Sequence, residues 1–192
     1  MGRKSNADQR RREIIWALYD CLAEQGHEKV TIKSIAARAG LPYGVIHYYF
    51  KDKEEIISEL ARAVVERYSQ GLEDHLAAAR TDRQEISMAI DYVVDELIFS
   101  RSLNRVFVNL IQMAFERETL HAVMTGMFRA YRRRFVEVLK NAGVEQQAEA
   151  TGAAVVALAE GFSLQWMVEP GVFTKEEVKT ALIRAVGQLP AT

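Results

Sequence analysis

The chain has 192 residues, 49% of them hydrophobic, so it is long enough to bury a substantial core in one or two domains. Its single cysteine, Cys21, excludes an intramolecular disulfide framework and a cysteine-based zinc finger. No uninterrupted apolar run approaches the ~18 residues of a membrane span, and residues 1–13 are too charged for a secretory signal. These features predict a soluble, cytoplasmic protein with no membrane partner.

The net charge of −1 hides an uneven distribution along the chain. Residues 1–53 contain ten lysines and arginines against six acids, a net +4, so the remainder of the chain carries −5. A basic N-terminal part on an acidic body is expected when only one end of a protein meets a polyanion. An ordinary solvated surface also produces such a distribution, so the charge supports a nucleic-acid partner only together with a motif.

The first predicted helix runs from about Asp8 to Glu24 and ends at Gly26. Its inner face carries the apolar residues Ile14, Ile15, Leu18, Cys21 and Leu22. Cys21 on this face is interpreted as a small core residue, and Arg11 and Arg12 as a solvated face.

Residues 30–57 predict two short helices joined by a tight turn. Thr31 is suited to N-cap the first, Gly40 supplies its left-handed exit, and Pro42 begins the second where no amide hydrogen is needed. One side of the second helix carries the core residues Ile46, Tyr49 and Phe50, and the other carries Tyr43, Gly44, His47 and Tyr48. Tyr48 is as compatible with a core position as with a DNA contact. The arrangement is a helix-turn-helix, whose second helix enters the DNA major groove.

Periodicity and capping signals predict six further helices. They span about residues 52–79, 82–97, 102–115, 118–141 and 145–168, and a last one from Thr174 whose apolar stripe extends to Leu189. No strand alternation, internal repeat or low-complexity linker interrupts them. The expected fold is all-α with about nine helices. A three-helix DNA-binding domain is expected at residues 8–68 and a second helical domain at 69–192, for which the family resemblance described next implies ligand binding and dimerisation.

The segment TIKSIAARAGLPYGVIHYYFKDKEEII resembles the DNA-binding signature of the TetR family of bacterial transcriptional regulators. The matching positions are Ile35-Ala36, Ala39-Gly40-Leu41, Gly44-x-Ile46-His47-x-x-Phe50 and Lys53-Glu54. His47 departs from the pattern, since the family more often has tyrosine there. The rest of the chain agrees with the family only in length and helical character.

The motif supplies a set of candidate DNA contacts. Tyr43, His47 and Tyr48 are expected to project from the recognition helix, and Gly44 to let the backbone approach the duplex. Thr31 offers a hydroxyl and an unpaired helix-end amide to a phosphate, and for Lys53 the resemblance implies a phosphate contact. The complete candidate set is Thr31, Lys33, Pro42, Tyr43, Gly44, His47, Tyr48 and Lys53.

For the rest of the chain, the resemblance implies a small-molecule pocket and a homodimer formed by the last two helices. Small residues at 152–161 suit close helix contact, although packing within the same chain explains them too. A dimer would read a palindromic double-stranded operator with half-sites about one turn apart. The candidate pocket residues, each of which also fits a core, are Phe99, Phe107, Met113, Phe115, Met124, Phe128, Phe162 and Trp166, with Gln112, Glu96 or Glu160 as alternative polar anchors. Together they favour an apolar or amphipathic effector.

No catalytic site is expected. The four histidines are scattered, and no glycine-rich phosphate loop, nucleophile elbow or thiol pair is found, so neither a metal nor a cofactor is predicted. A helical enzyme with a dispersed site and a helical adaptor protein are the alternatives, and operator-dependent gel shifts would exclude both. The sequence therefore favours a ligand-responsive transcriptional regulator, and the resemblance implies a repressor that its effector releases from DNA.

Overall fold

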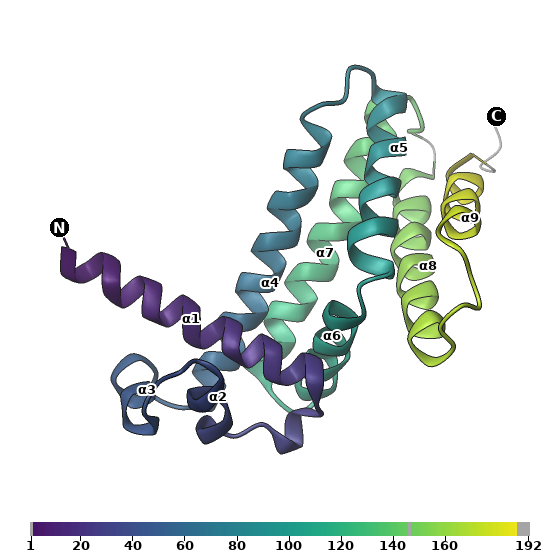
Figure 1. Cartoon of the computed structure of the whole chain (residues 1–192). Coiled ribbons are helices and arrows are strands. Elements are labelled where there is room, and N and C mark those ends of the chain that lie inside the picture. Colours follow the sequence, from purple (N-terminus) through teal and green to yellow (C-terminus); the bar gives the residue numbers. More distant parts are fainter. Residues whose placement is uncertain (1, 146, 188–192) are drawn as a thin grey trace. The chain divides into compact units, whose positions relative to one another are not determined.

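The computed structural model describes residues 2–145 and 147–187, which are helical almost throughout (Figure 1). The elements are α1 (Gly2–Glu24), the 3-10 turn η1 (His27–Lys29), α2 (Ile32–Arg38), α3 (Tyr43–Tyr49), α4 (Lys53–Leu76), α5 (Asp82–Tyr92), the π-helical η2 (Val93–Ile98), α6 (Arg101–Ala114), α7 (Glu118–Asn141), α8 (Ala148–Val168) and α9 (Lys175–Gly187). The nine α-helices among these residues confirm the all-α prediction. Leu189, predicted to end the last apolar stripe, lies outside the described residues.

The helices form two compact units. Unit 1 contains the described residues up to Glu66 together with Arg105–Thr125, and unit 2 contains Arg67–Asn104 and the described residues from Gly126 onward. Residues 105–125 thus group with the helix-turn-helix, although the sequence assigned them to the other domain. The domain limits 8–68 and 69–192 stay a prediction.

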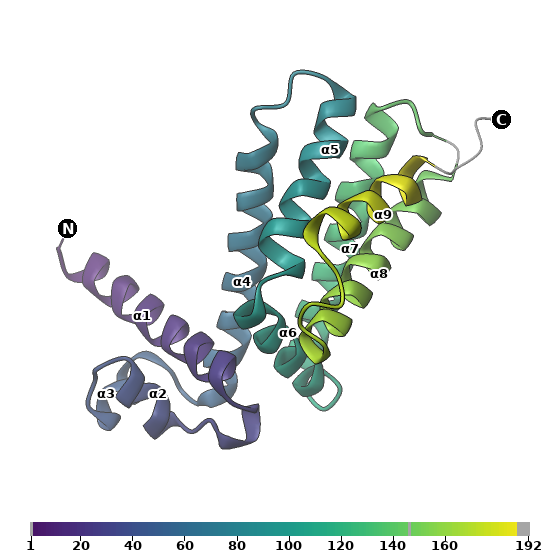
Figure 2. The same ribbon diagram turned by 45° about the vertical axis from the view of Figure 1, so that its right-hand side comes forward.

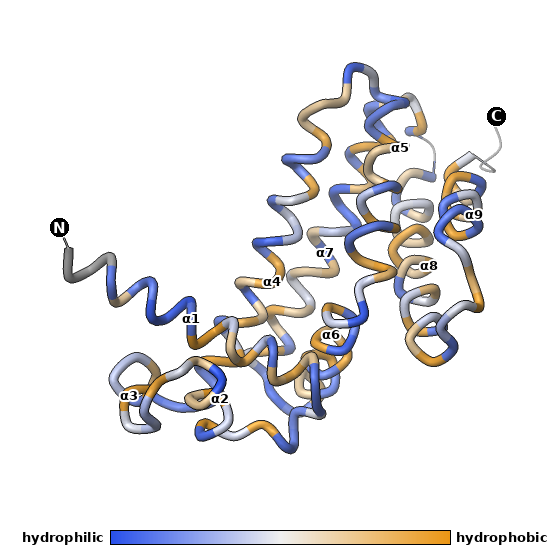
Figure 3. Tube along the Cα trace, viewed as in Figure 1, coloured by the Kyte–Doolittle hydropathy of each residue, from blue (hydrophilic) through white to orange (hydrophobic). Residues whose placement is uncertain are grey.

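In unit 1, α1 packs on α2 and α3 through the expected apolar residues. Ile14, Leu18, Ile35 and Ile46 have no exposed surface, and Cys21 is buried beside them. Figure 3 shows mostly hydrophilic residues in α1 after its grey N-terminal stretch, followed by recurring apolar residues in the second half of the helix. Gly40 has φ +66°, the left-handed conformation that lets the chain turn from α2 toward α3.

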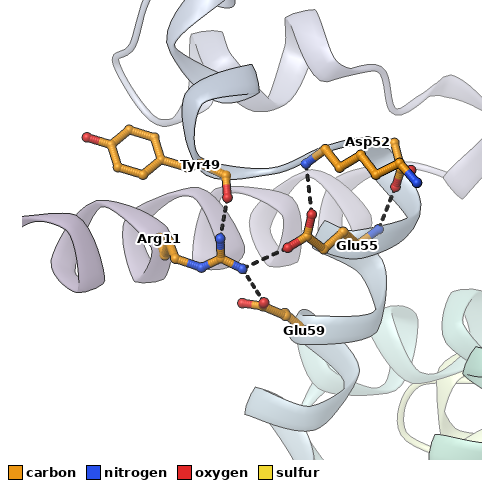
Figure 4. Close-up of polar contacts among 6 residues, drawn as sticks. Arg11, Tyr49, Asp52, Glu55 and Glu59 are labelled. Atoms are coloured by element: carbon orange, nitrogen blue, oxygen red, sulfur yellow. Dashed lines mark hydrogen bonds and ion pairs between the residues drawn. The ribbon is translucent and has the colours of Figure 1, made fainter.

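Arg11 of α1 connects three elements of unit 1 (Figure 4). Its guanidinium donates to the backbone carbonyl of Tyr49 at the end of α3 and to the carboxylates of Glu55, at 3.0 Å, and Glu59 on α4. It also lies 4.2 Å from the centre of the Phe50 ring. Burial alone would lower the pKa of Arg11, but the hydrogen bonds to Glu55 and Glu59 outweigh it and raise the pKa. The interpretation of Arg11 as a solvated residue is therefore wrong.

Glu55 also organises the start of α4. Its amide donates to Asp52 Oδ1 at 2.9 Å, as expected for an N-cap, while its second carboxylate oxygen accepts the Lys51 amide at 2.8 Å. Hydrogen bonds from Lys51 and then Arg11 lower the pKa of Glu55. The turn between α3 and α4 is therefore held by one carboxylate that α1 also contacts.

Unit 2 is built around an apolar core from several helices. The buried members are Leu76, Ala89, Ile90, Val93, Val94, Ile98, Phe135, Val155, Val156, Val178 and Leu182. Helix α9 packs on α8 (Figures 1 and 2). Lys179 of α9 forms an ion pair with Asp91, and Lys175 pairs with Asp95 at 2.6 Å.

The continuous α-helix predicted through Leu97 is interrupted by η2. The Phe99 amide donates to the carbonyl of Val94, five residues earlier, which is the π-helical spacing. The wider winding brings Ile98 nearly above Val93, whereas α-helical winding would turn it away. The side chains of Val93, Val94 and Ile98 are all buried as a result.

The expectation that no segment is apolar enough to span a membrane is wrong for helix α8. By length and composition Ala148–Val168 could do so, with a mean hydropathy of 1.2, although one such helix is weak evidence because core helices of soluble proteins also qualify. The acids Glu149 and Glu160 interrupt its apolar run, so the segment does not stand out as one uninterrupted apolar stretch. Only 22% of this apolar window is buried within the chain.

The Arg11 contacts generate a prediction about stability. Replacing Arg11 with Ala should lower the free energy of unfolding by about 1–2 kcal/mol, because the Tyr49 carbonyl and two carboxylates lose a partly exposed shared partner. Urea denaturation followed by circular dichroism measures the change. The matched control is Arg12→Ala, whose side chain is exposed and should change stability by less than about 0.5 kcal/mol. Equal effects of the two substitutions would contradict the bridging role of Arg11.

Candidate DNA-binding interface and effector site

Helix α3 exposes the four residues that the sequence placed on its outer face. Tyr43 is 55% exposed and Tyr48 is 82% exposed, and Gly44 and His47 are also open to solvent. The rings of Tyr43 and His47 meet edge to face, with their centres 5.4 Å apart. Ile46 lies buried on the opposite side. The sequence did not decide whether Tyr48 is buried or exposed, and the structure shows that it is a surface residue. That Tyr43, Gly44, His47 and Tyr48 contact DNA stays a prediction.

Gly44 interrupts this face with a position that has no side chain. A Cβ atom built there would meet nothing within 4 Å, and its φ is not positive. Neither packing nor backbone conformation within the chain therefore requires glycine. A surface that approached α3 closely would require it.

Thr31 caps α2 in a way that changes its expected role. Its hydroxyl oxygen accepts the Ser34 amide at 3.1 Å, and its own amide donates to Ser34 Oγ at 2.9 Å. The expectation of an unpaired Thr31 amide is therefore wrong, because Ser34 completes a capping box. The hydroxyl hydrogen still has a free direction toward a phosphate. Lys33 and Pro42 are exposed nearby.

The ammonium group of Lys53 makes two hydrogen bonds within unit 1. The Nζ atom donates to the carbonyl of His27 at 3.2 Å and to that of Val30. Burial, and next the charge of Arg117, lower the pKa of Lys53, while Glu54 opposes the shift. An ammonium has three hydrogens, so a phosphate contact would use the one that remains. Lys53 also holds the residue directly before Thr31 in place.

Asn109 and Arg105 of α6 position the same region, and the sequence analysis missed both. The buried Asn109 amide donates to the carbonyl of Leu22 at 3.2 Å, and its oxygen accepts the His27 amide at 2.7 Å. Arg105 donates to the Glu24 carbonyl at 2.8 Å. These bonds satisfy carbonyls at the end of α1 that have no partner within the helix. An asparagine on the apolar face of an amphipathic helix was the available signal.

The candidate effector residues fall into both units. Phe107, Met113, Phe115 and Met124 belong to unit 1, where Met113 and Met124 are buried and Phe115 is 82% exposed. This exposure gives no support for a pocket wall at Phe115. Phe99, Phe128, Phe162 and Trp166 belong to unit 2. There the rings of Phe99 and Trp166 lie 5.3 Å apart, and Phe162 packs on Phe173.

Of the three alternative polar anchors, only Glu160 is not exposed. Gln112 and Glu96 are exposed, whereas Glu160 on α8 is half-buried. Burial raises the pKa of Glu160 to about 7. Burial also raises the pKa of Tyr131 to about 12, helped by the neighbouring Tyr92 and by the charge of Glu160.

Comparison with known proteins supports a regulatory role. Residues 14–60 match the family described as bacterial regulatory proteins, tetR family, and residues 82–190 match the C-terminal domain of the BetI-type transcriptional repressor. The HTH-type transcriptional regulator BetI of Escherichia coli O17:K52:H18 is 25% identical over 158 residues, which cover 81% of each chain.

Two solved structures share the fold. A regulator from Saccharomonospora viridis in complex with choline is 16% identical, covers 95% of this chain and 97% of its own, and has a TM-score of 0.84. The regulator FadR of Bacillus subtilis in complex with stearoyl-CoA is 18% identical, covers 91% and 96%, and has a TM-score of 0.77. The two family models together extend over most of the present chain. The chain therefore belongs to the TetR family of bacterial regulatory proteins and, with its BetI-type C-terminal domain, is a cytoplasmic, ligand-responsive DNA-binding repressor and not an enzyme.

Proposed function

We propose that two copies of this repressor bind a palindromic operator, each placing α3 in the major groove, and that an amphipathic effector bound by unit 2 releases them. The observation that carries the proposal is the outer face of α3, where exposed aromatic and imidazole side chains flank a glycine that the fold does not require. In this arrangement Tyr43, His47 and Tyr48 contact base edges. Thr31, Lys33 and the remaining hydrogen of Lys53 contact phosphates, and Pro42 begins the inserted helix.

The proposed homodimer uses the apolar surface of α8 and α9. Leu164 is 55% exposed and Val168 80% exposed on α8, and Ile183 is 44% exposed on α9. A Cβ atom at Gly161 would meet nothing within 4 Å, so this small residue leaves room for another helix. Gly152 differs, because its Cβ would lie 2.9 Å from Val136 Cγ2 of the same chain. Two such helices from each copy would form a four-helix interface with two-fold symmetry.

The proposed release couples effector binding to the distance between the two recognition helices. Solved structures with this fold hold choline in one case and stearoyl-CoA in another, which supports a small-molecule effector here, and the amphipathic stearoyl-CoA agrees with an apolar or amphipathic one. Helices α4, α6 and α7 each have residues in both units, and α4 is the one that directly follows α3 in the chain, so an effector would act through α4. The effector would shift the population toward orientations in which α3 and its copy no longer match both half-sites.

Selection of bound sequences from random double-stranded DNA tests operator binding. We expect enrichment of an inverted repeat with half-site centres about one helical turn, ~10 base pairs, apart. Gel shifts should then show retention of that repeat and weaker retention of a single half-site. Enrichment of an isolated half-site without its inverted copy would contradict reading by a two-fold dimer.

Gly44→Ala separates folding from DNA contact. Alanine fits the open space at this helical position and should leave the unfolding free energy unchanged or raise it by about 0.5–1 kcal/mol. The added methyl group should nevertheless weaken operator binding about tenfold, the cost of roughly one disturbed base-pair contact. Fluorescence anisotropy with the selected operator measures the loss. The control Gly126→Ala adds a methyl group in similarly open space on α7 and should bind as tightly as wild type.

Leu164→Glu tests the dimer. A carboxylate in an apolar helix interface would be desolvated without a partner, so the variant should sediment as a folded monomer at micromolar concentration, where the wild type is a dimer. Val108→Glu is the matched control, because Val108 is an exposed apolar residue on α6 outside the proposed interface. The interface assignment is wrong if Leu164→Glu remains dimeric or if the wild type is monomeric.

A further inference from the structure

We infer that Asn109 of α6 is a positioning residue for operator binding. Through the backbone of His27 it fixes where α2 begins, and with it the N-cap residue Thr31. The inference rests on the proposed function only in giving Thr31 a phosphate contact. Because Asn109 is buried, with 8% of its surface exposed, it acts on DNA only through other residues.

The side-chain amide of Asn109 is held in one orientation. Its nitrogen donates to the carbonyls of Leu22 at 3.2 Å and Arg105 at 2.9 Å, and its oxygen accepts the His27 amide at 2.7 Å. Turning the amide over would place its oxygen against two carbonyls and its nitrogen against an N–H group. The three bonds therefore fix the side chain of Asn109 and, through it, the position of the His27 amide.

The backbone of His27 is held from a second side by α4. Its carbonyl accepts Lys53 Nζ at 3.2 Å, and the same Nζ also donates to the carbonyl of Val30, the residue directly before Thr31. Side chains from α6 and α4 thus hold the amide and the carbonyl of a single residue. A shift of residues 27–30 relative to either helix would lengthen or break one of these bonds.

An ion pair joins the two supporting helices close to Lys53. Arg117, in the turn between α6 and α7, pairs through Nε with Oε2 of Glu54 at 2.8 Å, and Glu54 lies in the first turn of α4. All of these residues belong to unit 1. Loss of the Asn109 bonds would therefore free the His27 amide without separating α6 from α4.

Thr31 depends on this segment for its position. The capping box with Ser34 orients the Thr31 hydroxyl relative to α2, but it does not set where α2 begins relative to α1. The apolar contacts between α1 and α2 tolerate small shifts. Phosphate contacts set the register of a protein on the duplex. With the His27 amide released, the start of α2 would vary in position, and specific binding would bear the cost of ordering it.

Asn109→Leu keeps a similar volume and removes all three hydrogen bonds. We expect the folded variant to bind the selected operator about tenfold or more weakly. Its affinity for random DNA should stay within about twofold of wild type, and the salt dependence of binding should not change, because no charged contact is lost. Fluorescence anisotropy measures these affinities at a temperature where circular dichroism shows a folded variant. Unchanged operator affinity, or equal losses for operator and random DNA, would overturn the inference.

Asn104→Leu is the matched control. Asn104 lies on the same helix and is 6% exposed, but its amide donates to the Ile98 carbonyl at 2.7 Å and not to the segment between α1 and α2. This variant should lower the unfolding free energy as well, yet bind the operator as tightly as wild type. Equal losses of operator affinity in the two variants would contradict the positioning role. Asn109→Ser, a smaller change in packing, provides the same comparison if leucine prevents folding.

A double-substitution cycle tests the route through Thr31. Thr31→Val removes the hydroxyl and should weaken operator binding about tenfold, roughly the cost of one lost contact. If Asn109 acts through Thr31, adding Asn109→Leu to Thr31→Val should cause clearly less than a further tenfold loss. Additive losses, or no loss in Thr31→Val, would overturn this route.

The inference and the proposed function fail separately. If the wild type selects an inverted repeat and Asn109→Leu binds it with unchanged affinity, the positioning role is wrong and operator binding stands. If the wild type selects only an isolated half-site, the two-fold dimer is wrong. The comparison of Asn109→Leu with Asn104→Leu on that half-site then decides the role of Asn109.

Discussion

The orientation of the recognition helix in unit 1 depends on the guanidinium of Arg11, which connects α1 with α3 and α4. The recognition helix α3 has only seven residues, too few to be stable alone, so its orientation must come from its neighbours. Arg11 bonds the carbonyl of Tyr49 at its end and two acids of α4 with one rigid fork. A lysine at this position would carry the same charge but lack the planar fork. The orientation of α3 is thereby tied to both helices that flank it.

Polar contacts to backbone groups set the remaining geometry of unit 1. Lys53 bonds carbonyls before α2, and Asn109 bonds both a carbonyl and an amide around the end of α1. Such contacts are directional, whereas the apolar core tolerates small rotations of its members. Unit 1 therefore combines an apolar core with a few polar side chains that fix the position of the backbone between the end of α1 and the start of α2.

Local signals were readable from the sequence because they act over one helical turn. The cap at Thr31, the left-handed Gly40 and the limits of α7 all follow from residues within a few positions of each other. Contacts between distant segments were not readable. Arg11 meets residues about forty positions away, and Asn109 meets the end of α1 more than eighty positions away. The π-helical winding of η2 depends on tertiary packing, which periodicity does not report.

The two ion pairs between α9 and the α5–η2 segment have a consequence for the proposed dimer. Lys175 and Lys179 are one turn apart, as are Asp91 and Asp95, so the pairs form an antiparallel ladder with two rungs. Sliding α9 along its axis by one turn would leave at least one rung unpaired, so the ladder selects a single axial position for α9. In a dimer with a two-fold axis, a shift of α9 in one protomer would be accompanied by the same shift in its partner. The distance between the two protomers would then change by both shifts together. By fixing the axial position of α9, the two ion pairs would therefore also limit variation in that distance.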